Sequence, residues 1–292
     1  MNKIIASIFV FFLASAAFAE SEIGISGSVN WETMRLEAEI SLDLALSGLK
    51  LPAGRTQAEE LLEAGFTTQL RPHLMKLQVD SSSTIGDLVS RGDLSLLHTD
   101  AIMKGSSAVP PSMRPDLKKM TVSRSISLSN TSASLLRHTR PVPIVRTLLP
   151  VSAASYTGII IIAAESLPIH GMRSSALAVP CLFPKIWDSE MNLIYDRNML
   201  ETRNTGMIRY APLNSIFQRN PSGLTDELRQ FAGEKPLRIF ARGVFGINPT
   251  DIIIDRSDAL LIISTEENRR LLSQGKVVII LDDTVLKYDF GD

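Results

Sequence analysis

The first part of the chain alternates between apolar and polar positions with a period of two. From residue 34 to residue 46 every even position is apolar, and the odd positions between them are mostly charged or hydroxylated. The segment 23–31 carries its apolar residues on odd positions, so the parity changes between the two segments. A period of two is typical of a strand with one buried face. The pattern therefore predicts a β-hairpin that turns near Glu32 and Thr33.

A helical period follows this hairpin. Between residues 58 and 77 the apolar residues recur at three- and four-residue spacing, which predicts a long helix. Thr56 and Glu59 have the spacing of a capping box at its start. Pro72 lacks a backbone N–H, so we expect it to kink or restart this helix.

Shorter elements fill the rest of the first half. Thr84 and Asp87 predict the cap of a short helix that stops at Gly92. The segment Leu94–His98 is expected to be a strand, and so is the alternating segment Met120–Asn130. The serines of the second strand are expected to form a solvated face.

Prolines at positions 141, 143 and 150 mark a boundary, which we place between Arg140 and Ala154. Beyond it, six consecutive apolar residues after Gly158 predict a central strand that is buried on both faces. Further strands are expected at 178–187, 193–195, 237–244, 251–255 and 277–281, and helices at 224–231, 255–263 and 265–274. Because strands and helices do not alternate regularly, the predicted class is α+β, with mixed, mainly antiparallel sheets and helices on one face.

The N-terminus has the pattern of a cleavable export signal. Lys3 precedes an apolar run, and Ala17-Phe18-Ala19 has the A-x-A form of a cleavage site. We therefore expect a signal peptide over residues 1–19, cleavage after Ala19 and a periplasmic location. The mature chain would hold two modules, 20–140 and 154–292. It has no second apolar run long enough to cross a membrane, so no transmembrane segment is expected.

Composition narrows the choice of partners. The 30 Lys and Arg residues nearly balance the 31 Asp and Glu residues, leaving a net charge of -1. Such a chain offers no basic field for nucleic acid, so no nucleic-acid partner is expected. Cys181 is the only cysteine and cannot form an internal disulfide. Its apolar neighbours predict a buried thiol and not a nucleophile.

Searches for catalytic and cofactor-binding motifs find none in the sequence. The four histidines, at positions 73, 98, 138 and 170, are far apart and form no pair at i, i+4 spacing. We therefore predict no enzyme, no catalytic residues, no cofactor and no metal ligands. An exported hydrolase with a dispersed active site remains an alternative, and a peripheral protein that binds envelope polysaccharide is another.

One acidic group has a second interpretation. Asp251, Asp255 and Asp258 lie close in sequence, and Asp282 and Asp283 follow a later strand. If strand ends brought them together, their oxygens would suit Ca²⁺ or Mg²⁺. The simpler expectation is that they cap helices and solvate strand ends. Similarly, two arginines on the strand 237–244 are expected to lie on its solvated side: Arg238 and Arg242.

Part of the second module resembles a known family. Three segments carry the resemblance: Tyr156-Thr157-Gly158 before the buried strand, Pro180 to Asp188 with its Pro-Lys-Ile step, and Ile194-Tyr195. They are similar to exported bacterial proteins related to the flagellar assembly protein FlgT and to FlgP-type outer-membrane lipoproteins. The step Val79 to Thr84 is similar to the lipoprotein-like module. The step Ile162 to Glu165 departs from the family pattern.

The resemblance implies a structural or assembly role in the periplasm and at the outer membrane, through binding to protein partners. The family supplies no catalytic residues to transfer. We therefore expect a non-catalytic structural or assembly protein of the cell envelope, including flagellar assembly, whose exposed strand edges and helix surfaces bind its partners.

Overall fold

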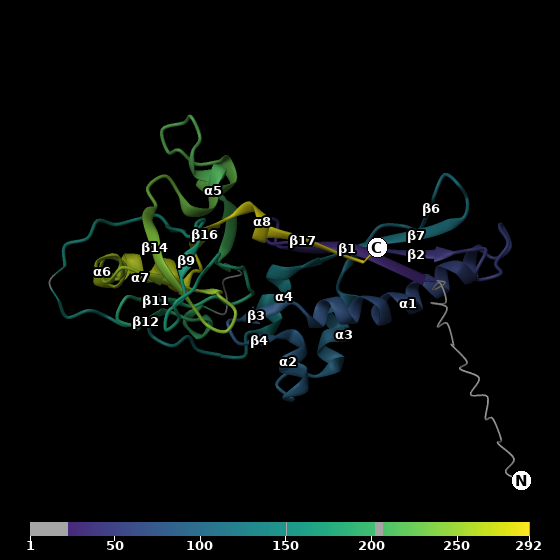
Figure 1. The fold of residues 1–292 in the computed structure, drawn as a ribbon, viewed down its shortest axis with the longest axis horizontal. Coiled ribbons are helices and arrows are strands. Elements are labelled where there is room, and N and C mark those ends of the chain that lie inside the picture. The colour runs from purple at the N-terminus through teal and green to yellow at the C-terminus, as the bar shows by residue number, and fades with distance from the viewer. Residues whose placement is uncertain (1–22, 150, 202–206, 292) are drawn as a thin grey trace, which may run out of the picture.

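The computed structural model describes residues 23–149, 151–201 and 207–291. The expected signal peptide, residues 1–19, lies outside the described residues. The described chain forms an elongated molecule with one sheet toward each end (Figure 1). Both modules combine helices with sheets, so the α+β class and the two modules predicted from sequence are confirmed.

The first module contains these elements: β1 (Ile23–Asn30), β2 (Arg35–Asp43), α1 (Arg55–Met75), β3 (Gln78–Asp80), β4 (Ser83–Thr84), α2 (Ile85–Ser90), α3 (Leu96–Lys104), β5 (Ser107–Ala108), β6 (Ser112–Met113), β7 (Lys119–Ser127) and α4 (Leu128–Leu135). The rest of the chain contains β8 (Ile159–Ile162), β9 (Leu167–Pro168), β10 (Ser175–Ala176), β11 (Ile186–Asp188), β12 (Leu193–Tyr195), the 3-10 turn η1 (Arg197–Met199), β13 (Arg209–Pro212), the 3-10 turn η2 (Leu213–Ile216), α5 (Asp226–Ala232), β14 (Leu237–Phe245), β15 (Asp251–Ile254), α6 (Arg256–Ser264), α7 (Glu266–Ser273), β16 (Val277–Leu281), α8 (Asp283–Leu286) and β17 (Lys287–Gly291).

The predicted hairpin is confirmed as β1 and β2, which pair antiparallel across a turn at residues 31–34. Their apolar positions face α1, whose buried residues recur at four-residue spacing from Ala58 to Leu74. The opposite face carries serines and charged residues, because alternate side chains of a strand point to opposite sides. The sheet has the order β17-β1-β2-β7-β5, with β6 also paired to β7, and all its pairs are antiparallel.

Three details of the first module differ from the sequence prediction. Gly54 is the N-cap of α1 and makes no side-chain cap hydrogen bond, so the capping box at Thr56 is wrong. Pro72 lies inside α1, which continues to Met75 without a break. The segment Leu94–His98 is not a strand, because Ser95 accepts a hydrogen bond from the backbone N–H of His98 and starts α3.

The second sheet has the order β12-β11-β15-β14-β8-β16-β13. Strand β8 is central and pairs parallel with both β14 and β16, which explains its unbroken apolar sequence. Parallel pairs also join β16 to β13 and β11 to β15, whereas β15 runs antiparallel to β14. Among the described strands of both modules, antiparallel pairs remain the more numerous.

Helices lie on both faces of the second sheet. Ile159 and Ile161 of β8 belong to the large apolar cluster that contains residues of α6 and α7. Ile160, which points the other way, packs in a second cluster with Leu228 and Ala232 of α5. The sheet of the first module differs from this arrangement. Helix α1 covers one of its faces, and the opposite face carries hydroxyl groups and charged side chains.

The C-terminal strand crosses between the modules. Strand β17 pairs antiparallel with β1, so that Ser26 lies opposite Gly291. Residues 287–291, which the expected second module 154–292 includes, therefore complete the sheet of the first module. Local sequence patterns do not indicate this pairing, because its partners are separated by almost the whole chain.

A continuous apolar cluster connects the two modules. At their contact the Trp31 and Tyr210 rings meet edge to face, with centroids 5.9 Å apart. Backbone hydrogen bonds add to it: the N–H groups of Leu182 and Phe183 donate to the carbonyls of Gln78 and Val79, at 3.0 and 2.8 Å. The modules are thus joined through buried surface and a shared strand, not only by the connecting segment.

Candidate functional site: a hydroxyl-lined groove and the module junction

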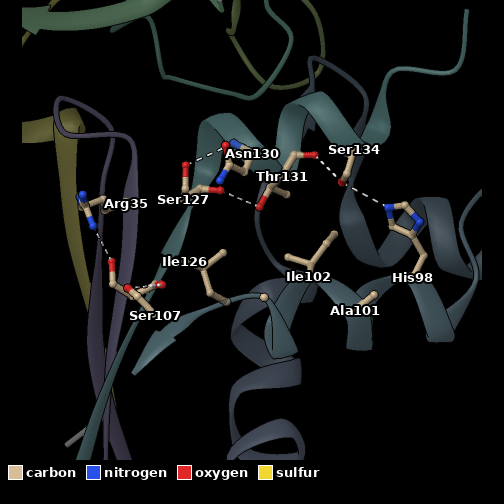
Figure 2. A pocket seen from close by; sticks show the side chains of 12 residues that line it. Arg35, His98, Ala101, Ile102, Ser107, Ile126, Ser127, Asn130, Thr131 and Ser134 are labelled. Carbon is tan, nitrogen blue, oxygen red and sulfur yellow. Dashed lines mark hydrogen bonds between the residues drawn. The ribbon is translucent and has the colours of Figure 1, made fainter. Parts of the chain in front are cut away.

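A groove of about 400 Å³ opens between β7, α3 and α4 in the first module (Figure 2). Arg35 and His98 are its ionisable residues, and most of the remaining polar groups are hydroxyls. A smaller apolar part comes from Ile102 and Ile126 and lies between the two helices. The full lining is Arg35, His98, Ala101, Ile102, Gly105, Ser107, Ser125, Ile126, Ser127, Asn130, Thr131 and Ser134.

Arg35 enters the groove from β2, where it lies opposite Ser127 of β7. Its Nη1 donates a 3.1 Å hydrogen bond to the Ser125 hydroxyl. None of the ion pairs among the described residues involves Arg35. The groove therefore presents a guanidinium group without a carboxylate partner, and such a group can bind a carboxylate or phosphate with two parallel hydrogen bonds.

His98 is held from the opposite side of the groove. Its Nε2 lies 3.2 Å from the Ser134 hydroxyl, which itself donates to the Thr131 carbonyl at 2.8 Å. When the Ser134 hydroxyl donates to that carbonyl, the first bond requires the His98 tautomer that carries its proton on Nε2. A serine nucleophile needs the reverse arrangement, in which the imidazole accepts the hydroxyl proton. In the Nε2–H tautomer the pair positions hydrogen-bonding groups along the groove wall.

Two other hydroxyls of the groove stabilise α4. The Ser127 hydroxyl accepts from the backbone N–H of Asn130 at 3.2 Å and caps the helix. The Thr131 hydroxyl donates to the Ser127 carbonyl at 2.9 Å. The groove wall is thus fixed by local hydrogen bonds, which a surface needs if it is to recognise a ligand without rearranging.

A second polar constellation lies at the module junction and is centred on Asp251, at the start of β15. Asp251 is 1% exposed, and its carboxylate accepts four hydrogen bonds. The Ser81 hydroxyl and the Trp187 Nε1–H donate to Oδ2 at 3.1 and 3.3 Å. The Lys185 backbone N–H and the Thr250 hydroxyl donate to Oδ1, each at 3.3 Å. Burial raises the pKa of Asp251, while these donors act to lower it.

The junction joins segments that sequence analysis singled out separately. Ser81 comes from the step Val79 to Thr84, and Lys185 and Trp187 come from the Pro-Lys-Ile segment. Gly246, at φ +112°, lets the backbone after β14 approach Ser81, because an added Cβ would lie 2.3 Å from the Ser81 Cβ. Sequence reasoning found these segments but missed that one buried carboxylate connects them.

The acidic residues do not form the metal site considered above. Asp255 caps α6 and Asp282 caps α8, and hydrogen bonds from Ser257 and Thr284 hold the pKa of each carboxyl below its usual value. Since β15 runs antiparallel to β14, β8 and β16, Asp255 lies at the opposite edge of the sheet from Asp282.

Asp251 lies at the edge shared with Asp282, but β14 and β8 separate their strands by roughly 14 Å. Throughout residues 23–149, 151–201 and 207–291, no three His, Cys, Asp or Glu side chains are grouped so that they could hold a metal ion. Asp258 lies in the first turn of α6, where burial and the nearby Asp255 raise its pKa. Asp283 is the first residue of α8.

The remaining histidines occupy separate positions. His73 stacks on Phe290 of β17, and His170 contacts Phe245 edge to face. His138 bonds to the Leu200 carbonyl through Nε2 at 2.8 Å. Arg238 and Arg242 lie on the exposed side of β14, as predicted.

Cys181 is fully buried beside Tyr210. The Tyr210 hydroxyl accepts from the Cys181 backbone N–H at 3.1 Å and donates to the Cys181 carbonyl at 2.8 Å. Burial raises the pKa of the Cys181 thiol to about 12. The expectation of a buried, unreactive cysteine is therefore confirmed.

This burial makes thiol labelling a measurement of unfolding. At pH 8 we expect a thiol reagent to leave Cys181 unmodified in the folded protein, because the thiolate is the reactive form. In denaturant the same reagent should modify one thiol per chain, since the sequence holds one cysteine. Rapid stoichiometric labelling without denaturant would contradict the packing around Tyr210.

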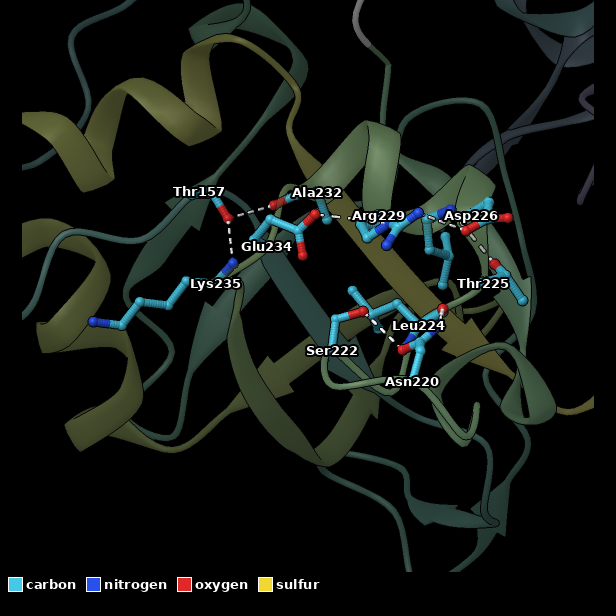
Figure 3. Close-up of polar contacts among 11 residues, drawn as sticks. Thr157, Asn220, Ser222, Leu224, Thr225, Asp226, Arg229, Ala232, Glu234 and Lys235 are labelled. Atoms are coloured by element: carbon cyan, nitrogen blue, oxygen red, sulfur yellow. Dashed lines mark hydrogen bonds and ion pairs between the residues drawn. The ribbon is translucent and has the colours of Figure 1, made fainter.

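The Tyr-Thr-Gly motif connects β8 to the end of α5 (Figure 3). The Thr157 hydroxyl donates to the Ala232 carbonyl at 2.7 Å and accepts from the Lys235 N–H at 3.0 Å. The next position, 158, requires glycine, because an added Cβ there would lie 2.6 Å from the Ala232 carbonyl oxygen. Gly233 has φ +78° and packs directly on Thr157. The motif is therefore structural: it allows α5 to pack tightly on the sheet.

Replacing Gly158 with Ala tests this role. The added methyl group meets backbone atoms, which cannot rotate away, so we expect the free energy of unfolding to fall by about 2 kcal/mol. Denaturant unfolding measures the change. Gly105→Ala is the control, since its Cβ would make only ordinary contacts of 3.4 Å. Equal effects of the two substitutions would contradict the assigned role of Gly158.

The structure thus defines a two-module α+β protein with a polar groove in the first module and a buried carboxylate at the junction. Both modules have counterparts in one known protein. The N-terminal domain of Treponema pallidum Tp0624 matches residues 22–135, and the second domain of the same protein matches residues 158–283. The chain is therefore similar to these two domains, in the same order. No curated protein matches it significantly. Among the described residues, no helix is long and apolar enough to span a membrane.

Proposed function

We propose that this chain is exported to the periplasm and acts there as a non-catalytic structural or assembly protein of the cell envelope. The export-type N-terminal sequence supports the location. The similarity of its Tyr-Thr-Gly and Pro-Lys-Ile segments to flagellar assembly proteins of the FlgT and FlgP type supports the role, and flagellar assembly is one process in which it would act.

The observation that carries the proposal is the competing hydrogen bond of the Ser134 hydroxyl, which has the Thr131 carbonyl as an acceptor beside His98. The groove holds the pair of residue types from which a hydrolase is built, but the shorter bond of the Ser134 hydroxyl, at 2.8 Å, goes to the Thr131 carbonyl and not to the imidazole. Arg35 on the other side offers its guanidinium without a carboxylate partner. These groups support binding of a partner, so the proposal places partner recognition in this groove.

The two segments of the resemblance support a structural role in a second way. Gly158 and Thr157 position α5, while Lys185 and Trp187 bind Asp251 at the junction. Their spacing in the sequence follows from packing requirements. Residues of this kind hold elements and modules in a fixed arrangement, which a structural protein requires.

Export and partner binding can be tested in the same cells. We expect the chain to be found in the periplasmic or envelope fraction with a mature N-terminus at Glu20. Affinity purification should retain a defined envelope partner, and Arg35→Ala with His98→Ala should release it. Arg91→Ala, on the surface of α2's C-terminus, is the control. A cytoplasmic precursor, or equal retention by all variants, would overturn the proposal.

Envelope polysaccharide is a second candidate ligand, which the lining of the groove favours. Hydroxyl and amide groups of Ser107, Ser125 and Asn130 could bind the hydroxyls of a sugar, and Arg35 could bind an acidic substituent. Calorimetric titration with purified envelope polysaccharide distinguishes it from a protein partner. Heat that disappears in Arg35→Ala favours the polysaccharide, whereas turnover that disappears in His98→Ala would indicate the hydrolase.

A further inference from the structure

The segment that connects the modules, residues 137–149, forms an exposed strap without helix or strand. It leaves the end of α4 and reaches the end of the second module, at the left of Figure 1, away from the first module's sheet. Prolines 141 and 143 restrict its backbone. The strap therefore presents its side chains at one end of an elongated molecule.

The strap exposes large apolar side chains, which folded proteins usually bury in their core. Leu148 is 95% exposed, and three further residues are about half exposed: Val142, Val145 and Leu149. Single exposed apolar residues are common, but four within eight positions concentrate apolar surface on one short segment. Ile144 is different, since it packs against the core and holds the middle of the strap to the module.

Hydrogen bonds fix the strap where it leaves the first module. The Val142 N–H donates to the Asn198 carbonyl at 2.7 Å, and His138 Nε2 lies 2.8 Å from the Leu200 carbonyl. Further along, the Leu149 N–H donates to the Thr147 hydroxyl at 3.0 Å. The last of these bonds lies within the strap, so the strap is attached to the second module through His138, Val142 and the packed Ile144.

The charge of the strap has one sign. Arg137, Arg140 and Arg146 are exposed, and none takes part in an ion pair of the described residues. The sequence contains no Asp or Glu from residue 117 to residue 164. Asp196 lies on the loop that binds the strap. Its Oδ1 accepts hydrogen bonds from the backbone N–H and the side-chain amide of Asn198.

We propose that this strap docks the protein onto an anionic lipid bilayer. Leu148 and its apolar neighbours would enter the interface between headgroups and acyl chains, while the three arginines would bind the headgroup phosphates. Exposed apolar residues interleaved with basic residues are what such peripheral docking requires. This attachment goes beyond the proposed function, because partner recognition is placed in the groove of the first module and not in the strap.

Sedimentation with lipid vesicles tests the proposal on the whole mature chain. We expect binding to vesicles that contain phosphatidylglycerol and little binding to vesicles of phosphatidylcholine alone. Arg140→Gln with Arg146→Gln should weaken binding about 25-fold, since each basic residue near an anionic surface contributes about fivefold. Val145→Ser with Leu148→Ser should weaken it about tenfold by removing apolar surface. Inorganic phosphate should not compete.

Matched controls separate the strap from charge and hydrophobicity in general. Arg55→Gln with Arg114→Gln removes the same charge from the first module, and Leu97→Ser removes an apolar residue that is 81% exposed on α3. Both should bind vesicles like the wild type. All substituted side chains are exposed, so the variants should keep the wild-type melting temperature. The proposal is overturned if the wild-type chain stays in the supernatant, binds both vesicle types equally, or binds as well with either strap substitution as without it.

Discussion

Replacing Leu42 with Asp should lower the free energy of unfolding by about 4 kcal/mol, because the new carboxylate would lie without a partner in the core. Leu42 is fully buried on β2, in the row of side chains that faces α1. Its neighbours across the sheet, Ile23 and Met120, belong to the same apolar layer. Thermal and denaturant unfolding measure the loss.

Ser41→Asp is the matched control for this substitution. It introduces the same carboxylate one position earlier, on the face of the sheet that points away from α1. We expect an effect below about 1 kcal/mol there. If the two substitutions had equal effects, or if Leu42→Asp melted like the wild type, the assignment of the buried face of β2 would be wrong.

Replacing Asp251 with Ala should cost about 3 kcal/mol, because it leaves buried donors of both modules without an acceptor. The Trp187 indole N–H, the Lys185 backbone N–H and the Ser81 hydroxyl all donate to this carboxylate. Asp251→Asn keeps one oxygen but turns an amide group toward donors, so its cost should be smaller. Denaturant unfolding at several pH values measures both.

The pH dependence of the Asp251 effect has a definite sign. Burial raises the pKa of this carboxyl in the folded protein above its unfolded value, so the folded state binds the proton more tightly. Wild-type stability should therefore fall relative to Asp251→Asn as the pH rises from the unfolded pKa, near 3.8, through the folded pKa. A relative rise in wild-type stability over that range would contradict the dominance of burial.

Local pattern predicted most elements of this fold. The hairpin of β1 and β2, the buried strands β8 and β16, and the Thr84 capping box all follow from neighbouring residues, and all are present. The error at Leu94–His98 has a local cause as well. Leu94 is buried but Leu96 and Leu97 are exposed, so these apolar residues do not form the buried face of a strand. The cap at Ser95 starts a helix there instead.

Long-range pairing could not be predicted from such patterns. The addition of β17 to β1 depends on residues at opposite ends of the chain, and the Asp251 carboxylate meets Ser81 across 170 positions. One contact completes the first module's sheet and the other lies at the junction, and each single residue also has an ordinary local interpretation. Likewise, His98 and Ser134 are common residue types, and they come within hydrogen-bonding distance only because α3 and α4 lie side by side.

Crosslinking from within the groove is the most direct test of the account, which holds that the groove binds an envelope partner without catalysing a reaction. A photoreactive amino acid at Asn130, in the exported full chain, should give one discrete adduct with an envelope component in living cells. The same group at Glu60, on the exposed side of α1, should give none. The absence of an adduct at Asn130 would contradict the account, and so would multiple-turnover conversion of the captured component, in its free form, by the purified protein without the photoreactive group.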